Sequence, residues 1–138
     1  MVESTGQSII SFRKNKKTER SFNIIKIGLE LPKEELHTNI NSRVDKMLED
    51  GLLEEVGSLN GYRDVNALQT VGYSEIFEHL DGKITLATAI EEIKKNTRQY
   101  AKRQMTWFKK DKEIKWINAK QTGEIVSMAQ KLVQTERK

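Results

Sequence analysis

The sequence of 138 residues has no cysteine, a single proline and only two histidines. A chain without cysteine forms neither disulfide bonds nor thiolate zinc sites. His37 and His79 are single and unclustered, which favours a structural or surface role for each over metal binding. These absences exclude the disulfide-stabilised and cysteine-ligated zinc classes of small proteins.

Long apolar runs are missing too. None approaches the ~18 residues that a membrane-spanning helix needs, and the start of the chain lacks the apolar stretch of a signal peptide. We therefore expect a cytoplasmic protein with no membrane contact. The phosphate-binding pattern G-x-x-x-x-G-K-[ST] is also absent, because Ile84 follows the only Gly-Lys pair, Gly82-Lys83.

Charge is abundant but unevenly distributed. Charged residues make up 32% of the chain and the formal net charge is +4. Residues 94–120 hold ten Lys or Arg against two acids, whereas residues 30–60 hold eight acids against three bases. This asymmetry predicts an anionic partner for the C-terminal half.

Hydrophobic spacing predicts a mostly helical chain with two short strands, one domain in total. Residues 13–21 are expected to form a basic, flexible connector. The expected strands are 23–31, buried on both faces, and 114–117. The expected helices run from Pro32 in the first helical position to a C-cap at Gly51, from Leu52 onward, over 66–80 with a break near Gly72, from an N-cap at Thr85 to about Lys110, and over 125–133.

The helix expected after Thr85 has two distinct faces. At 100° per residue, five cations share one sector about 100° wide: Lys94, Lys95, Arg98, Lys102 and Lys109. The adjoining sector is apolar and includes Tyr100, Trp107 and Phe108, which we expect to pack in the core. The cationic face suits a phosphate backbone, and the alternative is an ordinary solvated basic face.

Four sequence blocks, in order, resemble the tRNA dimethylallyltransferase (IPP transferase) family. They are K-I-G-L-E-L at 26–31, R-V-D-K-M-L at 43–48, A-L-Q-T-V-G-Y at 67–73 and T-R-Q-Y-A-K-R-Q-M-T-W-F-K at 97–109. The resemblance extends from about Thr5 to Asn118. It implies that the chain is the C-terminal helical part, with sheet-edge strands, of a P-loop α/β prenyltransferase.

The family prenylates an adenosine beside the anticodon. The resemblance therefore implies two partners, the tRNA anticodon stem-loop and dimethylallyl diphosphate, and we expect a monomer. It also implies an ATP-type nucleotide-binding P-loop core and Mg²⁺ for the full enzyme, neither of them bound by residues of this chain. With those parts missing from the sequence, we expect this chain alone to be inactive.

Arg43 is the candidate catalytic residue. It occupies the i+3 position of the apolar stripe formed by Leu36, Ile40 and Met47. A guanidinium at the edge of such a stripe needs an anion or carbonyl groups. By pattern alone, snorkelling or a salt bridge to an acid such as Glu30 is favoured. The family resemblance instead implies that Arg43 holds the prenyl diphosphate.

Two segments are candidates for tRNA binding. In the first, Gly72 permits a close backbone approach, and Gln69 and Tyr73 can hydrogen-bond or stack on a base; the alternative is a helix start with a buried tyrosine. In the second, Lys102 and Lys109 would contact phosphates, while Arg103 points about 100° away. The full set implied by the resemblance is Gln69, Thr70, Val71, Gly72, Tyr73, Arg98, Lys102, Arg103, Gln104, Met105, Thr106, Trp107, Phe108 and Lys109.

Two other functions remain open on the sequence. The chain could be a non-catalytic basic helical module that binds RNA or DNA, or a helical protein–protein adaptor whose charges only contact solvent. Salt dependence of RNA binding separates the adaptor from the other two, because a surface that binds phosphates loses affinity steeply as salt rises.

Overall fold

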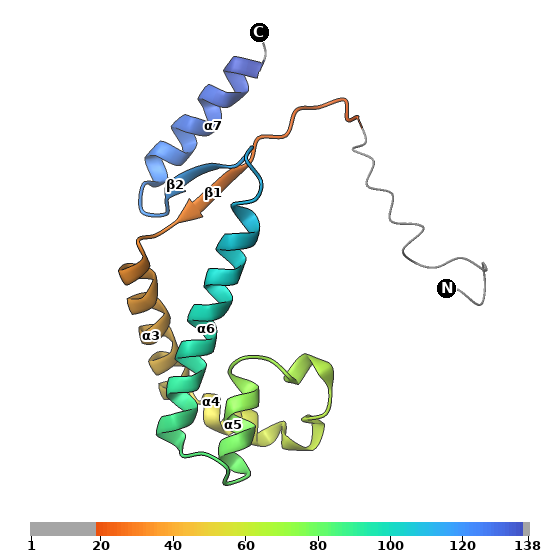
Figure 1. The fold of residues 1–138 in the computed structure, drawn as a ribbon, viewed down its shortest axis with the longest axis vertical. Coiled ribbons are helices and arrows are strands. Elements are labelled where there is room, and N and C mark those ends of the chain that lie inside the picture. Colours follow the sequence, from red (N-terminus) through yellow and green to blue (C-terminus); the bar gives the residue numbers. More distant parts are fainter. Residues whose placement is uncertain (1–18, 137–138) are drawn as a thin grey trace, which may run out of the picture.

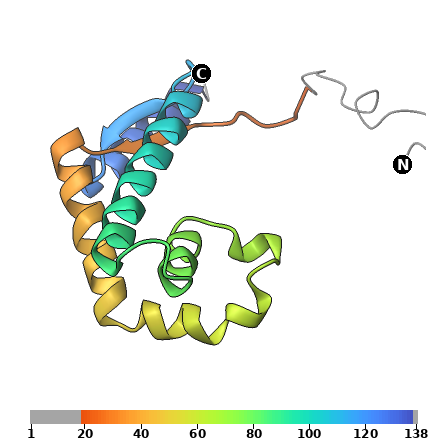
Figure 2. The ribbon, with the colours of Figure 1, turned by 60° about the horizontal axis from the view of Figure 1, so that its bottom comes forward.

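The structure is a computed structural model that describes residues 19–136. Figures 1 and 2 show two arms that meet at a bend. The long arm holds β1 (Ile27–Glu30), α3 (Lys33–Glu49), α6 (Leu86–Phe108), β2 (Lys115–Asn118) and α7 (Thr122–Glu136). The short arm holds α4 (Leu52–Ser58), η1 (Asn60–Tyr62), η2 (Asn66–Leu68) and α5 (Tyr73–Leu80). The mostly helical fold with two short strands is confirmed.

The two strands pair in parallel although 84 residues separate their ends. Gly28 lies opposite Trp116 in the register, and a Cβ atom at Gly28 would lie 2.6 Å from the Trp116 ring. Parallel strands need a long crossover connection, which here comprises α3 to α6. The pairing therefore brings the two ends of the helical segment together.

Strand β1 is shorter and more open than expected. Only residues 27–30 pair with β2, so the expected strand at 23–31 is too long at both ends. Leu29 is 53% exposed, which contradicts the expectation that both faces are buried. Most of the predicted connector, residues 13–18, lies outside the described residues.

Helix α3 begins one residue later than the sequence suggested. Pro32 has φ −52° and ψ 143°, an extended conformation, so it precedes the helix and is not its first helical residue. Its carbonyl oxygen accepts the Leu36 N–H at 2.9 Å. Gly51, with φ +104°, allows the chain to turn from α3 into α4.

Helix α6 is the longest element of the long arm. The Thr85 side chain accepts the Thr88 N–H at 3.1 Å, which confirms the predicted N-cap. The helix continues for 23 residues to Phe108. Its first half packs on the short arm through Ala89 and Ile93, which are buried, and its second half reaches the sheet (Figure 1).

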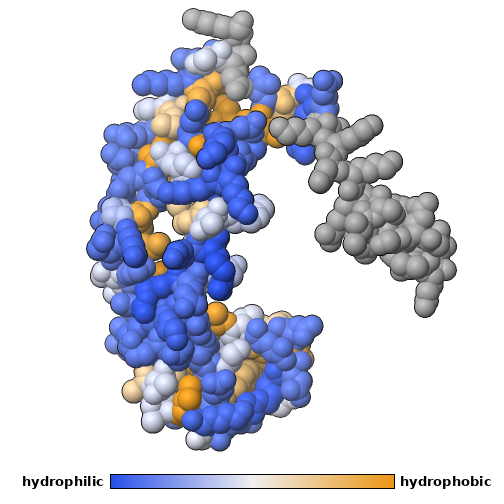
Figure 3. Space-filling view, in the orientation of Figure 1, coloured by the Kyte–Doolittle hydropathy of each residue, from blue (hydrophilic) through white to orange (hydrophobic). Residues whose placement is uncertain are grey.

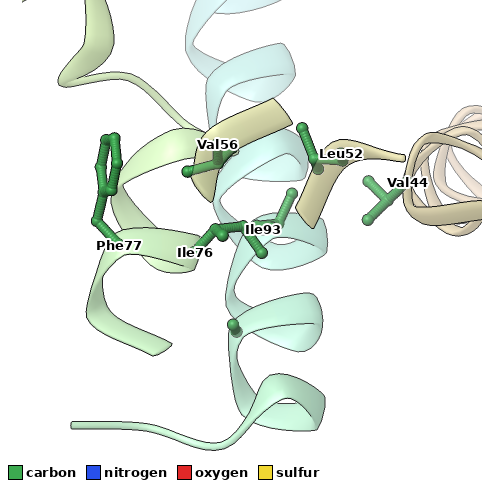
Figure 4. Packing of buried hydrophobic residues seen from close by; sticks show 7 residues of the cluster. Val44, Leu52, Val56, Ile76, Phe77 and Ile93 are labelled. Carbon is green, nitrogen blue, oxygen red and sulfur yellow. The ribbon is translucent and has the colours of Figure 1, made fainter. Parts of the chain in front are cut away.

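The core lies at the bend, where α3, α4, α5 and α6 meet (Figure 4). Its buried members are Val44, Leu52, Val56, Ile76, Phe77, Ala89 and Ile93. Each of the four helices contributes its apolar face, and each face is buried only because the other three helices pack against it. The described residues include no helix long and apolar enough to cross a membrane.

Candidate functional site

Arg43 lines a groove of about 360 Å³ between α3, α6 and the loop before α5. Ile40, Arg43, Val44 and Met47 come from α3, Thr70, Val71 and Gly72 from the loop, and Ile93, Thr97 and Tyr100 from α6. Two segments that the sequence singled out separately, Arg43 and residues 70–72, therefore face one groove. The floor is apolar, and the polar groups stand at its edge.

The Arg43 guanidinium has no partner among the described residues. Its side chain is exposed, and no hydrogen bond or ion pair joins it to residues 19–136. The predicted salt bridge to an acid such as Glu30 is wrong for the described residues, because none of them pairs with Arg43 and Glu30 pairs with Lys109 at 3.2 Å. The other alternative, snorkelling, stays open, because the guanidinium is exposed beside apolar groove residues. A guanidinium carries a permanent positive charge and five N–H donors, so at this position beside an apolar groove it can bind an anion such as a diphosphate.

The loop that forms one wall of the groove is shaped by the backbone conformation of Gly72 and by hydrogen bonds to one carboxylate, that of Glu75. Gly72 has φ +101°, a conformation that residues with a side chain rarely adopt. Its N–H donates to Glu75 Oε2 at 2.8 Å, and the Asn96 side chain donates to Glu75 Oε1 at 2.7 Å. Glu75 and Asn96 were not among the predicted site residues. Glu75 had a sequence signal, an acid three residues after a helix-start glycine, but nothing in the sequence pointed to Asn96.

The predicted base-reading residues are not placed alike. Gln69, Thr70 and Val71 are exposed, and Gly72 is buried. The Tyr73 ring packs against the core and its hydroxyl donates to Glu55. That hydrogen bond, together with desolvation, raises the pKa of the Tyr73 hydroxyl above its usual value. A role for any of these residues in reading tRNA stays a prediction.

A second groove, of about 550 Å³, lies along α6 where that helix approaches β1 and the start of α3. Its charged lining is mostly basic: Lys33, Lys95, Arg98, Lys102 and Lys109 against the single acid Glu30, with His37 beside them. Arg98 donates to Asn41 Oδ1 at 2.8 Å. The Lys102 side chain is exposed, and its ammonium group has no hydrogen bond or ion pair to a described residue. Four cations of the predicted face, Lys95, Arg98, Lys102 and Lys109, therefore share this groove.

The fifth cation of that face has a different role. The Lys94 side chain is only 13% exposed and its Nζ lies 2.7 Å from Asp45 Oδ1 of α3. The assignment of Lys94 to a solvent-facing cationic sector is therefore wrong. Helix periodicity gave the correct angle around α6, but α3 lies against that angle and supplies an acid.

Trp107 and Phe108 are not in the core, contrary to the sequence-based expectation. Trp107 is 66% exposed and Phe108 is 37% exposed, and their rings meet edge to face at 4.9 Å between centroids. Tyr100, expected on the same apolar sector, is also exposed. The buried core contacts α6 only through its first half, at Ala89, Ile90 and Ile93, so the described residues leave these rings exposed.

A third groove, of about 550 Å³, combines Trp107 with cations on the outer side of α6. Its lining is Gln99, Lys102, Arg103, Thr106, Trp107 and Lys110. Lys102 and Gln99 line both this groove and the second one. Gln104 and Met105 line the apolar face that α6 turns to the sheet.

The described part of the chain holds no group of three or more His, Cys, Asp or Glu side chains placed to bind a metal ion. The acids near the grooves are paired with bases, such as Glu30 with Lys109. Metal ions such as Mg²⁺ need several oxygen ligands in one place. The described residues therefore offer no all-protein cage of three or more such side chains for an Mg²⁺ ion.

Comparison with known proteins identifies close relatives. A family model described as IPP transferase matches residues 1–111. The tRNA dimethylallyltransferase 1 of Bacteroides thetaiotaomicron is 53% identical over 122 residues, which are 88% of this chain and 40% of that protein. The tRNA dimethylallyltransferase of Cytophaga hutchinsonii is 47% identical over 134 residues, 97% of this chain and 44% of that protein.

Solved structures show the same fold. The full-length tRNA isopentenylpyrophosphate transferase of Bacillus halodurans superposes with a TM-score of 0.76 at 37% identity, covering 87% of this chain and 43% of that one. The Staphylococcus epidermidis tRNA delta(2)-isopentenylpyrophosphate transferase gives 0.73 at 33% identity, covering 94% and 45%. The chain thus spans about two fifths of the length of the relatives it matches.

Proposed function

The chain belongs to the IPP transferase family, and on that premise we propose that it is the prenyl diphosphate- and tRNA-contacting part of a tRNA dimethylallyltransferase. The proposed reaction moves a dimethylallyl group from its diphosphate to N6 of the adenosine next to the anticodon. N6 forms a bond to C1 of the dimethylallyl group, the C1–O bond breaks, diphosphate leaves with the bonding electrons, and N6 loses a proton. The proposed location is the cytoplasm and the proposed state is a monomer.

The observation that carries this proposal is the position of Arg43. Its guanidinium is exposed at the edge of an apolar groove and has no hydrogen-bond or ion-pair partner among residues 19–136. An apolar floor suits the dimethylallyl group, and a planar guanidinium suits diphosphate oxygens, on which negative charge grows as the C1–O bond breaks. Stabilising that charge is the role proposed for Arg43.

The tRNA would contact the long arm and the 69–72 loop. Lys102 and its neighbours in the second and third grooves would hold phosphates, and Trp107 beside Arg103 offers a flat ring and a cation to an unpaired base. Thr70 and Val71 line the groove of Arg43, where the target adenosine would enter, and Gln69 directly precedes them in the exposed loop. Phosphate contacts would set the position of the tRNA, and base contacts would set specificity.

Other parts of the reaction are assigned to the parent protein outside this chain. We propose that a P-loop nucleotide-binding core supplies the remaining diphosphate contacts, the Mg²⁺ ion and the proton acceptor. No residue between 19 and 136 is given those roles. The chain would complete that core with Arg43 and with the surface that binds tRNA.

A chimeric enzyme tests this proposal. The segment of the Bacteroides thetaiotaomicron enzyme that matches this chain, 53% identical to it, is replaced by this chain. The chimera is then incubated with tRNA and labelled dimethylallyl diphosphate. We expect labelled tRNA at a rate close to that of the parent enzyme.

A folded chimera that binds tRNA but transfers no label would overturn the proposal in favour of a non-catalytic RNA-binding module. A folded chimera that binds no tRNA would overturn both. Circular dichroism and thermal unfolding establish that the chimera is folded, so that neither outcome is confused with misfolding.

A further inference from the structure

We propose that Glu75 and Asn96 are positioning residues that fix the 69–72 loop against α6 and so set the width of the groove that holds Arg43. This inference rests on the proposed function, because it assigns the pair to the site of prenyl transfer. Neither side chain is placed in contact with substrate. Both act through the backbone of Gly72.

Each oxygen of the Glu75 carboxylate accepts one of these two contacts. Glu75 is 6% exposed and is the one buried charged residue among those described. One of its oxygens accepts the Gly72 N–H at 2.8 Å and the other accepts the Asn96 amide at 2.7 Å. A buried carboxylate that loses such donors is strongly destabilised, so the arrangement tolerates little movement of either donor.

The two donors belong to different walls of the groove. Gly72 ends the loop wall, in which Thr70 and Val71 precede it. Asn96 precedes Thr97, which with Tyr100 lines the α6 wall. The carboxylate is therefore a bridge between two walls, whereas Arg43 stands on the third wall, α3, which the bridge does not touch.

The chain has other means of stabilising this region. Ile76 and Phe77, the next residues of α5, are buried in the core and pack α5 on its neighbours. Leu68 and Tyr73 pack against the core at the two ends of the loop, but Gln69, Thr70 and Val71 between them are exposed. The hydrogen bonds of Glu75 therefore position the loop, whereas the apolar contacts of Ile76 and Phe77 hold α5 in place.

A pair of substitutions isolates the hydrogen bonds from the volume of the side chains. Asn96→Asp places a second carboxylate against Glu75, so the two repel each other. Glu75→Gln has an amide that can accept from Gly72 and donate to position 96. The double variant Glu75→Gln, Asn96→Asp therefore restores both hydrogen bonds with one of them reversed in direction.

The variants are made in the chimera. We expect Asn96→Asp to lower kcat by about 10- to 100-fold, the scale of a misplacement of roughly 1 Å. The affinity for prenyl diphosphate should stay within about twofold, because Arg43 is on α3 and does not move. The double variant should recover most of the lost kcat.

Arg63→Ala is the matched control for loss of stability. Arg63 pairs with Asp81 at the other end of α5, and neither residue lines the groove. We expect that variant to unfold more easily but to keep its kcat per folded enzyme. If Asn96→Asp behaves in the same way, or if the double variant fails to recover kcat, the pair is only structural and the proposal is wrong.

A measurement without activity separates this inference from the proposed function. The Gly72 amide proton, bonded to a buried carboxylate, should exchange slowly with water and should exchange faster in Asn96→Asp and again slowly in the double variant. If the parent chimera transfers no prenyl group, the proposed function fails on its own, whatever the amide shows. If Gly72 exchange does not respond to the variants, the bridge does not hold the loop and this inference fails.

Discussion

At the scale of single residues, the cations of the grooves divide into paired and unpaired ones. Lys94, Lys95 and Lys109 each have an acid within 4 Å, namely Asp45, Glu92 and Glu30. Arg43 and Lys102 have none among the described residues. A paired cation has to give up its acid to bind a new anion, so the unpaired ones are the stronger candidates for substrate contacts.

Arg43→Ala in the chimera should reduce turnover far more than tRNA affinity. Removing a donor that stabilises charge in a transition state typically costs ~3–4 kcal/mol. Arg43→Lys should recover only part of the loss, since an ammonium group cannot make the two parallel hydrogen bonds of a guanidinium. Single-turnover rates and tRNA binding curves, measured on the same preparations, decide this.

The opposite result would assign Arg43 differently. If tRNA binding collapsed while the remaining complex reacted at the normal rate, Arg43 would be an RNA contact and not a diphosphate ligand.

Lys102→Ala should weaken tRNA binding with little regard to the anticodon-loop sequence. Each lost phosphate contact makes the plot of log affinity against log salt shallower by roughly 0.7–0.9. Lys94→Ala on the same helix is the matched control, because Lys94 is bonded to Asp45 and should leave that slope unchanged. Affinities at several salt concentrations test both variants.

Gln69→Ala provides the contrast for Lys102→Ala. It should reduce the preference for a matched anticodon loop while leaving the salt slope nearly as it was, because base contacts release few counterions. Equal salt slopes and equal loop preferences for both variants would contradict the division into phosphate and base contacts.

At the scale of elements, the two arms rely on specific local fits. Helix α6 joins them, with its core contacts at one end and the sheet at the other. The sheet depends on Gly28, and the end of α5 depends on an ion pair between Arg63 and Asp81. Each of these contacts predicts how a substitution changes the stability of its element, independently of substrate binding.

Gly28→Ala should destabilise the strand pair. The added methyl group would lie 2.6 Å from the Trp116 ring and 2.9 Å from the Ile114 side chain, so one or both must shift. Overpacking of this kind costs about 1–3 kcal/mol. Gly57→Ala in α4 is the control, since no atom lies within 4 Å of its Cβ position, and there an alanine should be neutral or stabilising. Urea unfolding followed by tryptophan fluorescence compares the two.

Arg63→Gln should destabilise the end of α5 in a pH-dependent way. The hydrogen bond from Arg63 holds the pKa of the Asp81 carboxyl below its usual value of 3.8. A lowered carboxyl pKa stabilises the folded state above that value, and the effect is lost as the pH falls through the folded-state pKa. Parent and variant should therefore differ in unfolding midpoint at about pH 7, and the difference should shrink below pH 3.8. A constant difference would mean that the charge of Asp81 plays no part.

At the scale of the whole molecule, the long arm has an uncovered apolar side. A groove of about 970 Å³ is lined there by residues such as Ile27, Met105 and Trp116. Figure 3 shows hydrophobic atoms gathered at this end of the molecule. A sheet of two strands is marginal without further strands or a covering layer, which fits a chain that spans about two fifths of its relatives' length.

The 138-residue chain alone should transfer no prenyl group. It has no P-loop pattern, and residues 19–136 hold no group of three or more His, Cys, Asp or Glu side chains placed to bind a metal ion. Labelled dimethylallyl diphosphate and tRNA incubated with the chain should give no labelled tRNA, whereas the chimera should give it. Transfer by the chain above background would show that the catalytic residues have been misplaced.

The sequence by itself determined the elements and the family. Periodicity and end signals placed α6 with its Thr85 cap and the turn at Gly51, because these depend on residues close together in the chain. The four blocks identified the family and gave Arg43 as the candidate residue. Pro32 shows the usual limit of such signals. It correctly marked the start of α3, but it precedes the first helical residue instead of being that residue.

Only the tertiary structure decided what each face meets. The angle of Lys94 around α6 is fixed by its position in the sequence, but its pairing with Asp45 depends on where α3 lies. The same holds for the exposure of Trp107 and for the bridge from Glu75 to Asn96. These contacts join residues far apart in the chain, and a helical period records an angle about one axis without recording which neighbour occupies that angle.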